Sequence, residues 1–257
     1  MISIGITTFK RRLSMVSEMV SQIRQWSLDV PIHLAINGEV SDDFDEEYRK
    51  GILELCIKYP KIYTNFYPEF RSLARLWNNL VINSTSEYNL ILNDDIKFDP
   101  NINLVNVIDN IILNNPLIPL FTLNGSFGHF VVTKKLLDDM NYFDERFLLH
   151  GEEDGDFVWR YIDKFNTPPP TVMYNGIVNL EEDSEIGLKD TDIGYANKPK
   201  FNQEFTVTKY NYDPSATISG MYGRPHRKVL SDDRQYPYES FYFKNKENLK
   251  NFKNINL

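Results

Sequence analysis

Apolar and polar positions along the first part of the chain alternate in a way that predicts strands and helices in turn. Short apolar runs bounded by turn residues predict four strands, at 2–9, 31–36, 61–66 and 88–92. Between these runs, apolar residues recur at helical spacing and predict three helices, at 13–26, 45–59 and 72–83. Strands that alternate with helices favour an α/β fold, with a mostly parallel Rossmann-type sheet and helices on both of its faces.

The pattern is weaker in the second part of the chain. Asp99 followed by Pro100 is typical of a helix start, an N-cap and a proline at the first helical position, and predicts a helix through Leu113. Two further strands and one further helix are predicted, at 117–123, 128–133 and 152–164. The polar, weakly periodic stretch 181–234 predicts a long irregular region.

Composition narrows the class of protein. The chain has 257 residues, and we expect it to form one large domain. Its net charge of -8 argues against nucleic acid as a partner, because that affinity comes mainly from lysine and arginine. No run approaches the roughly 18 apolar residues of a membrane span, and the start lacks signal-peptide features, so we expect a cytoplasmic protein with at most peripheral contact at the inner face of the membrane. Cys56 is the only cysteine and is expected in the core.

Three polar clusters fall where predicted strands end. They are Thr7-Thr8-Phe9, Asn37-Gly38 and Asn93-Asp94-Asp95. Ligands of parallel sheets bind at the carboxyl ends of the strands, so these clusters predict one shared site. Mg²⁺ or Mn²⁺ is commonly held by one or two carboxylates together with substrate phosphates, which makes Asp94 and Asp95 candidates for a metal and diphosphate site. The alternative is a polar turn without a ligand.

A second acidic cluster, Glu152-Glu153-Asp154-Gly155-Asp156, opens the predicted helix at 152–164. A transfer reaction in which a hydroxyl attacks needs a base to take its proton, and a carboxylate can fill that role. The helix dipole also favours acidic residues in the first turn of a helix. The cluster is therefore open to a catalytic and to a purely structural interpretation.

The ordered set of motifs resembles family 2 glycosyltransferases of the GT-A fold. Segment 3–11 is similar to their opening strand and loop, and segment 90–95 is similar to their metal-binding motif of two aspartates flanking one residue. Segment 142–147, followed by 153–157, resembles their acceptor-side segment, whose acidic pair supplies the catalytic base. The likeness covers roughly residues 1–179 and leaves the final third unmatched.

The resemblance implies a single GT-A catalytic domain over 1–257. About 1–98 would form its nucleotide-sugar half, about 99–180 its acceptor-side half, and about 181–257 a loop-rich C-terminal region. The implied reaction is a metal-dependent, inverting transfer of a sugar, as in polysaccharide biosynthesis. The donor would be a nucleoside diphosphate sugar, with a UDP-sugar expected, and the acceptor a hydroxyl of a glycan or of a lipid-linked molecule.

The same resemblance assigns roles to individual residues. Asp154 is the implied base, with Glu153 as its substitute, and Asp95 is the implied ligand of Mn²⁺ or Mg²⁺. The implied donor-binding residues are Thr7, Thr8, Phe9, Arg11, Asn37, Arg71, Arg75, Asn93 and Asp94. For the basic residues the alternative is solvation: Arg11 and Arg12 would lie at a helix start, and Arg71 and Arg75, four apart, on an exposed helix face.

Three positions depart from the family's pattern. Asn37 stands where an aspartate commonly touches the nucleotide base, and Asn93 stands where the first acid of the metal motif is expected. Asn179 stands where a histidine often follows the late strand. His226, in the basic segment 221–228, is the candidate that would replace this histidine as a metal ligand.

Two other functions stay open on the sequence alone. A nucleotidyltransferase would share the early sheet, but it would show a glycine-rich first loop, which segment 7–11 lacks. A non-catalytic nucleotide- or sugar-binding module would accommodate Asn37 and Asn93, whereas the retained acids argue for catalysis. His129 and His150 flank the motifs and are not expected to be ligands.

Overall fold

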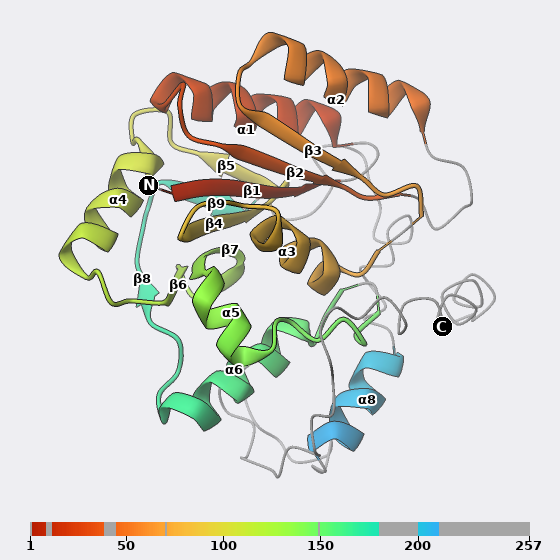
Figure 1. The fold of residues 1–257 in the computed structure, drawn as a ribbon, viewed down its shortest axis with the longest axis vertical. Helices are drawn as coiled ribbons and strands as arrows, with labels where there is room; N and C mark the ends of the chain where they lie inside the picture. Colours follow the sequence, from red (N-terminus) through yellow and green to blue (C-terminus); the bar gives the residue numbers. More distant parts are fainter. Residues whose placement is uncertain are drawn as a thin grey trace.

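The computed structural model describes residues 2–8, 12–38, 45–69, 71–148, 150–179 and 200–210. Figure 1 shows the arrangement of its elements. The strands are β1 (Ile2–Thr8), β2 (Ile32–Ile36), β3 (Ile62–Phe66), β4 (Tyr88–Asn93), β5 (Ile96–Phe98), β6 (Leu120–Leu123), β7 (Ser126–Thr133), β8 (Thr171–Val172) and β9 (Ile177–Asn179). The helices are α1 (Leu13–Trp26), α2 (Glu46–Lys58), α3 (Leu73–Ile82), α4 (Leu104–Asn114), α5 (Lys134–Met140), α6 (Glu153–Phe165) and α8 (Lys200–Tyr210). None of these helices is long and apolar enough to cross a lipid bilayer.

The sheet is mostly parallel, which confirms the predicted α/β class. Within the described ranges, seven strands lie in the order β3-β2-β1-β4-β7-β6-β8, and β5 pairs with β9 apart from them. The pairs β1–β2, β2–β3, β1–β4 and β6–β8 are parallel, while β7 runs antiparallel to β4 and β6. The reversal before β7 occurs at Asn124 (φ 54°) and Gly125 (φ 75°), the left-handed pair that a tight hairpin turn requires.

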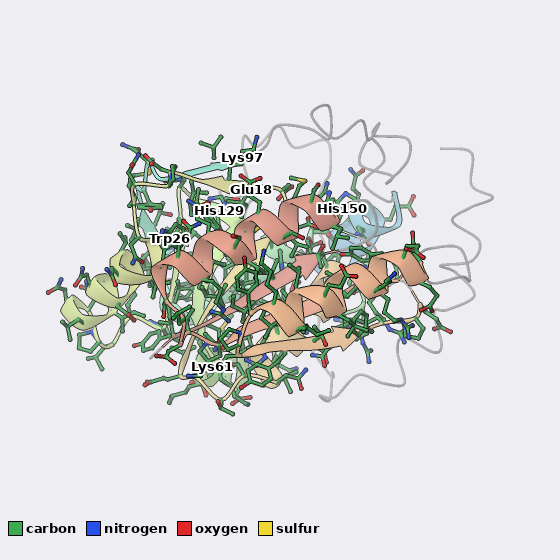
Figure 2. The ribbon with its side chains drawn as sticks, turned by 90° about the horizontal axis from the view of Figure 1, so that it is seen from above. Glu18, Trp26, Lys61, Lys97, His129 and His150 are labelled. Atoms are coloured by element: carbon green, nitrogen blue, oxygen red, sulfur yellow. The ribbon has the colours of Figure 1, made fainter. Side chains whose placement is uncertain are left out.

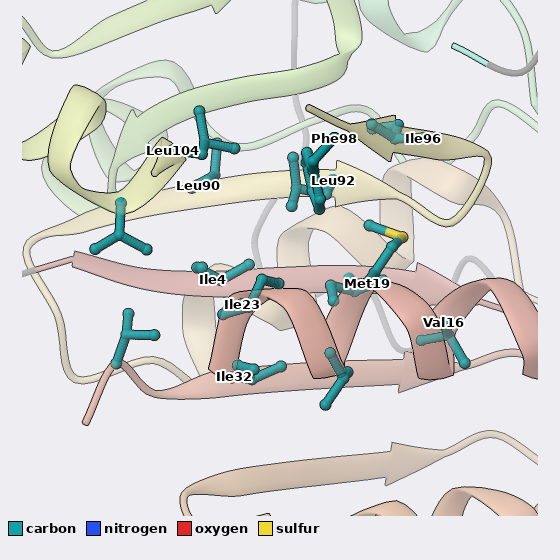
Figure 3. Packing of buried hydrophobic residues seen from close by; sticks show 14 of the residues in the cluster. Ile4, Val16, Met19, Ile23, Ile32, Leu90, Leu92, Ile96, Phe98 and Leu104 are labelled. Atoms are coloured by element: carbon teal, nitrogen blue, oxygen red, sulfur yellow. The ribbon is translucent and has the colours of Figure 1, made fainter. Parts of the chain in front are cut away.

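Helices cover both faces of the sheet (Figure 1). Helices α1, α2 and α4 pack on one face, where Val16, Met19 and Ile23 of α1 lie against β1, β2 and β4 (Figure 3). Helices α3, α5 and α6 contribute to the core on the other face. Because helices cover both faces of β1 and β4, all residues of β1 and the first five residues of β4 are buried, including the polar ones.

The core under α3, α5 and α6 is strongly aromatic. The Trp77 ring lies 5.1 Å from the Phe143 ring, and Phe143 stacks on Phe157 at 4.4 Å. Phe130 of β7 packs edge-on against Trp77 at 5.4 Å. These contacts join α3, the segment before α6, and α6 itself into one packed unit.

The predicted helix start at Asp99 is wrong. Helix α4 begins at Leu104, and Asn103 is its N-cap, accepting the backbone N–H of Asn106 at 3.0 Å. The Asp99 carboxylate instead accepts the backbone N–H of Asn101 at 2.8 Å, which closes a short turn after β5. The same residue types serve both purposes, because an aspartate side chain can satisfy the N–H groups of a turn as well as those of a helix.

Further differences concern short elements, one polar stretch and Cys56. Strands β5, β8 and β9 and helix α5 were not predicted, because two or three residues of strand or two turns of helix carry little periodicity. Helix α8 lies within the stretch 181–234 that was predicted to be irregular, and the rest of that stretch is outside the described residues. Cys56 is only half-buried, so its placement in the core was too strong.

Candidate active site

The acidic turn, Asp94 and Asp95, joins β4 to β5 at the carboxyl end of the sheet. The residue before it, Asn93, lies beside Thr7 in the parallel register of β1 and β4. Its Oδ1 accepts hydrogen bonds from the Thr7 hydroxyl at 3.1 Å and from Trp77 Nε1 at 3.4 Å. Asn93 therefore fixes the strand end from which the acidic turn departs.

Asp94 is neutralised inside the chain by Arg12. Arg12 Nη1 lies 2.6 Å from Asp94 Oδ1 and 3.9 Å from Asp95 Oδ2, and the Arg12 and Asp94 side chains are both 4% exposed. Burial raises the pKa of Asp94, and the Arg12 guanidinium opposes this shift. The second oxygen, Asp94 Oδ2, is buried and accepts no hydrogen bond from any described residue.

The pairing of Arg12 with the acidic turn was missed by the sequence interpretation, which considered solvation as the alternative for this residue. Its carbonyl accepts the N–H of Val16, so it stands one turn before the first buried residue of α1. This spacing places Arg12 on the buried side of the helix, and it was the available signal. Arg11, to which the sequence interpretation gave the diphosphate role, lies outside the described residues together with Phe9.

The two threonines at the end of β1 point to opposite faces of the sheet, as neighbours in a strand must. Thr7 bonds Asn93 on the α3 side, as described above. The Thr8 hydroxyl lies 2.6 Å from the hydroxyl of Tyr48, at the start of α2. Burial and the nearby charge of Asp94 raise the pKa of Tyr48, which keeps its hydroxyl protonated.

Asn37 fastens the end of β2 to the start of α3. Its Nδ2 donates to the carbonyl of Arg71 at 2.9 Å, and its Oδ1 accepts the N–H of Arg71 at 2.8 Å. The next residue must be glycine, because a Cβ on Gly38 would lie 2.6 Å from the carbonyl oxygen of Tyr67. The Asn37 amide is thus held by backbone, and its position fixes where α3 enters the site.

Arg71 precedes the N-cap of α3 and Arg75 lies in its first turn, so the two do not share a helix face as their spacing predicted, although their charges interact. Burial and the charge of Arg75 lower the pKa of Arg71. Arg75 Nη1 pairs with Glu145 Oε2 at 3.2 Å, and Asn78 donates to Glu145 Oε1 at 3.0 Å. Helix α3 therefore connects the nucleotide-side strand ends to the segment 142–147 that resembles an acceptor side.

The second acidic cluster begins α6 with strained backbone. Gly151 (φ 98°) and Glu152 (φ 77°) both have left-handed φ values, which a residue other than glycine rarely adopts. Asp154 follows in the first turn, half-buried, with Oδ1 accepting the N–H of Gly155 at 2.8 Å. Strained backbone of this kind often occurs at functional sites, where the surrounding structure holds it in place.

Glu153 is the most unusual acid of the cluster. It is 4% exposed, and its Oε2 has no hydrogen-bond partner within the described part of the chain. Burial, followed by the negative charge of Asp154, raises the pKa of Glu153 to about 8. At neutral pH Glu153 therefore carries a proton, and Asp154 is the more accessible carboxyl group of the two.

The last residue of β9 lies beside the acidic turn. In the antiparallel pair β5–β9, Asn179 is opposite Ile96, the residue that follows Asp95. Asn179 was the position where a metal-binding histidine was expected, and the backbone brings this position next to the acidic turn. His226, the candidate replacement, lies outside the described residues.

The two histidines that were not expected to be ligands differ in their surroundings. His129 is 2% exposed on β7, and burial lowers its pKa to about 4, so its imidazole is neutral. Figure 2 labels His129 within the body of the molecule and His150 on the side where α8 lies. The carbonyl of His150 is within 3.4 Å of Asn202 Nδ2.

A divalent metal is the cofactor that the family resemblance implies, and the donor set at the acidic turn fits one in part. Asp95 is partly exposed, and the bare Asp94 Oδ2 is a second carboxylate oxygen at the same turn. Within the described ranges, no three histidine, cysteine or acidic residues come together as a metal-binding group. One or two carboxylates suffice where substrate phosphates supply the other ligands, so the turn fits a metal that arrives with a diphosphate.

Comparison with solved structures identifies the fold. No protein-family model matches the chain, and no curated protein sequence matches it. S. aureus TarS superposes with a TM-score of 0.54 at 11% identity, over 74% of this chain and 41% of that chain. PcManGT from Pyrobaculum calidifontis, a mannosyltransferase solved with GDP-Man and Mn²⁺, superposes with a TM-score of 0.51 at 10% identity, over 67% of this chain and 54% of that chain.

These matches define the class of fold as that of GT-A glycosyltransferases. A shorter TarS structure, residues 1–349 in complex with UDP-GlcNAc, matches with a TM-score of 0.50 at 10% identity, over 70% of this chain and 60% of that chain. The chain thus spans about half the length of the solved structures that it matches. At this level of identity the likeness concerns the fold alone.

Proposed function

We propose that this chain is a glycosyltransferase that moves a sugar from a nucleoside diphosphate donor to a hydroxyl of a glycan or lipid-linked acceptor. One observation carries the proposal: the acidic turn and the acids at the start of α6 are joined by a short line of packed side chains. Asn93 accepts from Trp77, Trp77 packs on Phe143, and Phe143 stacks on Phe157 of α6. In Figure 1 the segment between α5 and α6 turns back on the side toward which β1 and β2 point.

The donor side of the site is built from the strand ends. We assign donor binding to Thr7, Thr8, Asn37, Arg71 and Arg75. Phe9 and Arg11, which lie outside the described residues, belong to the same assignment. The donors named in the comparison structures, UDP-GlcNAc and GDP-mannose, are both nucleoside diphosphate sugars. We assign a UDP-sugar as the donor, bound by about residues 1–98, and the acceptor side to about residues 99–180.

The chemistry assigned to the chain's own residues is a single displacement with inversion. The acceptor oxygen forms a bond to the anomeric carbon as the bond from that carbon to the diphosphate oxygen breaks. Asp154 takes the proton of the attacking hydroxyl, and the nucleoside diphosphate leaves with the bonding electron pair. The raised pKa of Glu153 favours its protonated form at neutral pH, and we assign the role of base to the more exposed Asp154. Asp95, with His226, would hold a Mn²⁺ or Mg²⁺ ion whose charge offsets that of the departing diphosphate.

Thermal-shift measurements with nucleotides test the donor side. UDP with Mn²⁺ should raise the melting temperature of the wild-type protein, and the increase should disappear in Asp95→Ala. Asp154→Asn is the matched control, because it alters the acceptor side and should keep the nucleotide-dependent shift. An unchanged shift in Asp95→Ala would overturn the metal assignment.

Release of nucleotide from the donor tests the catalytic side. Wild-type protein should release UDP or GDP from a nucleotide sugar, and Asp154→Asn should reduce this release at least a hundredfold, the lower end of what a catalytic base contributes. Nucleotide binding without release from any donor would instead favour a non-catalytic binding module. Full release by Asp154→Asn would transfer the role of base to another residue.

A further inference from the structure

Helix α8 presents one face to the segment that carries the acids. Asn202, Phe205, Thr206 and Lys209 recur at intervals of three and four residues, so they share that face. Asn202 is 0% exposed and Lys209 is 3% exposed, whereas Gln203 and Glu204 on the other side are exposed. Helix α8 belongs to the final third of the chain, the part without a family resemblance.

Asn202 holds the loop that leads into the acidic cluster. Its Oδ1 accepts the N–H of Leu148 at 2.9 Å. Its Nδ2 donates to the carbonyl of Leu148 at 2.7 Å and lies 2.8 Å from the carbonyl of Gly151. One buried amide therefore fixes both ends of the loop 148–151, directly before Glu152.

The other end of α8 holds the first turn of α6. Lys209 Nζ donates to Asp156 Oδ1, and to Asp144 Oδ2 at 2.8 Å. The Tyr210 hydroxyl donates to Asp156 Oδ1 at 2.7 Å, and Arg160 Nε donates to Asp156 Oδ2 at 2.9 Å. Both carboxylates are fully buried, so this ion-pair network is held in one geometry rather than solvated.

Between the two ends, Phe205 packs edge-on against Phe147 at 5.1 Å. The strained Glu152 and the acids Glu153 and Asp154 thus lie between two points that α8 fixes: the loop 148–151 and Asp156. A left-handed Glu152 persists only where the surrounding structure over-determines it, and α8 supplies the contacts on both sides.

We propose that α8 is a positioning element for the acids of α6, and that Asn202 and Lys209 are the positioning residues. This inference rests on the proposed function, in which Asp154 touches the acceptor hydroxyl. The hydrogen bonds of Asn202 and Lys209 go to the segment before α6 and to α6 itself, so the effect of the helix is on the acceptor-side acids. Nucleotide binding should therefore be independent of it.

Amide hydrogen exchange tests the positioning directly, in the full chain. In Asn202→Ala the amides of 148–156 should exchange at least tenfold faster than in the wild type, while the amides of β4 keep their rates. Gln203→Ala, at the exposed neighbouring position, is the matched control and should leave both regions unchanged. Equal acceleration in β4, or none in 148–156, would overturn the proposal.

Turnover per nucleotide-binding molecule separates positioning from simple stability. The assay is release of UDP from UDP-GlcNAc or of GDP from GDP-mannose, normalised to the stoichiometry of nucleotide binding. Asn202→Ala should lower this kcat at least tenfold and keep the donor KM within twofold. Faster exchange with unchanged normalised kcat would show that α8 supports the fold alone, which overturns the proposal.

Two provisions keep the test decisive. Phe205→Leu, which removes the ring contact with Phe147 but stays apolar, replaces Asn202→Ala should that variant fail to fold, with the same expected directions. Absence of release by the wild-type protein from both donors would count against the proposed function. The exchange measurement would still decide whether α8 holds the loop 148–151.

Discussion

The two acidic clusters of this protein place carboxyl groups in almost equal burial but in opposite electrostatic surroundings. Asp94 has the Arg12 guanidinium at 2.6 Å. Glu153 has no cation among the groups that shift its pKa, and the negative charges of Asp154 and Glu152 act on it instead. Burial raises the pKa of both groups, but only Asp94 has a positive charge that opposes the shift. One cluster therefore holds a carboxyl group that is paired with a cation, and the other holds a carboxyl group that can exchange a proton near neutral pH.

The difference shows that burial alone does not decide what an acidic residue does. A buried carboxylate with an internal counterion is held in one orientation, and in that orientation it can position a polar ligand or a metal. A buried carboxyl without one is neutral, and it confines the negative charge to its more exposed neighbour. Substitutions that exchange these surroundings should therefore have opposite effects on the two clusters.

The largest effect is expected from removing the counterion. Arg12→Met leaves the Asp94 carboxylate buried and unpaired, and should reduce the free energy of unfolding by about 3 to 5 kcal/mol. The measurement is urea denaturation at pH 7. Asp94→Asn in the same chain should restore most of the loss, because no charge then remains to be compensated. A loss below about 1 kcal/mol in Arg12→Met would contradict the claim that Arg12 is what holds Asp94 ionised.

Substitution of Glu153 is expected to change the free energy of unfolding in the opposite direction. Its pKa is about 8 in the folded protein and about 4.5 when unfolded, so the folded state binds the proton more tightly. Stability from this group is fully present below pH 4.5 and is lost as the pH rises through 8. Glu153→Gln should therefore raise the free energy of unfolding at pH 9 by roughly 2 to 4 kcal/mol and leave it nearly unchanged at pH 4.

Denaturation at pH 4, 7 and 9 checks this prediction. Asp163→Asn, which changes an exposed acid on the same helix, is the matched control and should give no comparable trend with pH. A Glu153→Gln variant that is less stable than the wild type at pH 9 would show that the carboxylate has a partner that compensates its charge.

The smallest effect on the free energy of unfolding is expected from substitution of His129. Burial is the main cause of the lowered pKa of this residue. Its pKa is lowered to about 4, whereas the unfolded value is 6.5, so its contribution to stability is complete above pH 6.5 and is lost as the pH falls through 4. His129→Leu should remove about 2 kcal/mol of the acid-induced loss between pH 7 and pH 4. If the free energies of unfolding of the wild type and of His129→Leu fell in parallel from pH 7 to pH 4, this prediction would be wrong.

Most of the sheet could be predicted from the sequence because its strands are long and carry full apolar runs. β1, β2 and β4 lie where the runs 2–9, 31–36 and 88–92 placed them, and α1, α2 and α3 follow the predicted helical spacing. The hairpin between β6 and β7 had its own signal in Asn124-Gly125. Strands β5 and β9, each three residues long, had none, because their pairing depends on contacts between distant parts of the chain.

The sequence predicted which residues lie at the candidate site, but it did not predict which other residues they contact. Sequence spacing predicted that Asn93, Asp94 and Asp95 lie at the end of a strand. The structure confirms this location, because β4 ends at Asn93. The spacing could not indicate that Arg12 pairs with Asp94, because that contact spans 82 residues and depends on how α1 packs. The same holds for Asn202, which reaches the backbone of Leu148 and Gly151, and for Lys209, which reaches Asp156, both from a helix 11 residues long in a polar stretch.

The two hydrogen bonds between the Asn37 side chain and the backbone of Arg71 bear on how similar sequences are searched for. The resemblance to family 2 glycosyltransferases implies an aspartate at this point, so a motif search built on it would count Asn37 as a lost binding residue. An aspartate here would lack the N–H that Asn37 donates to the Arg71 carbonyl, and would place its charge against that oxygen. Asn37→Asp would therefore loosen the entry to α3, so a motif search for chains of this fold should allow both residue types at this site.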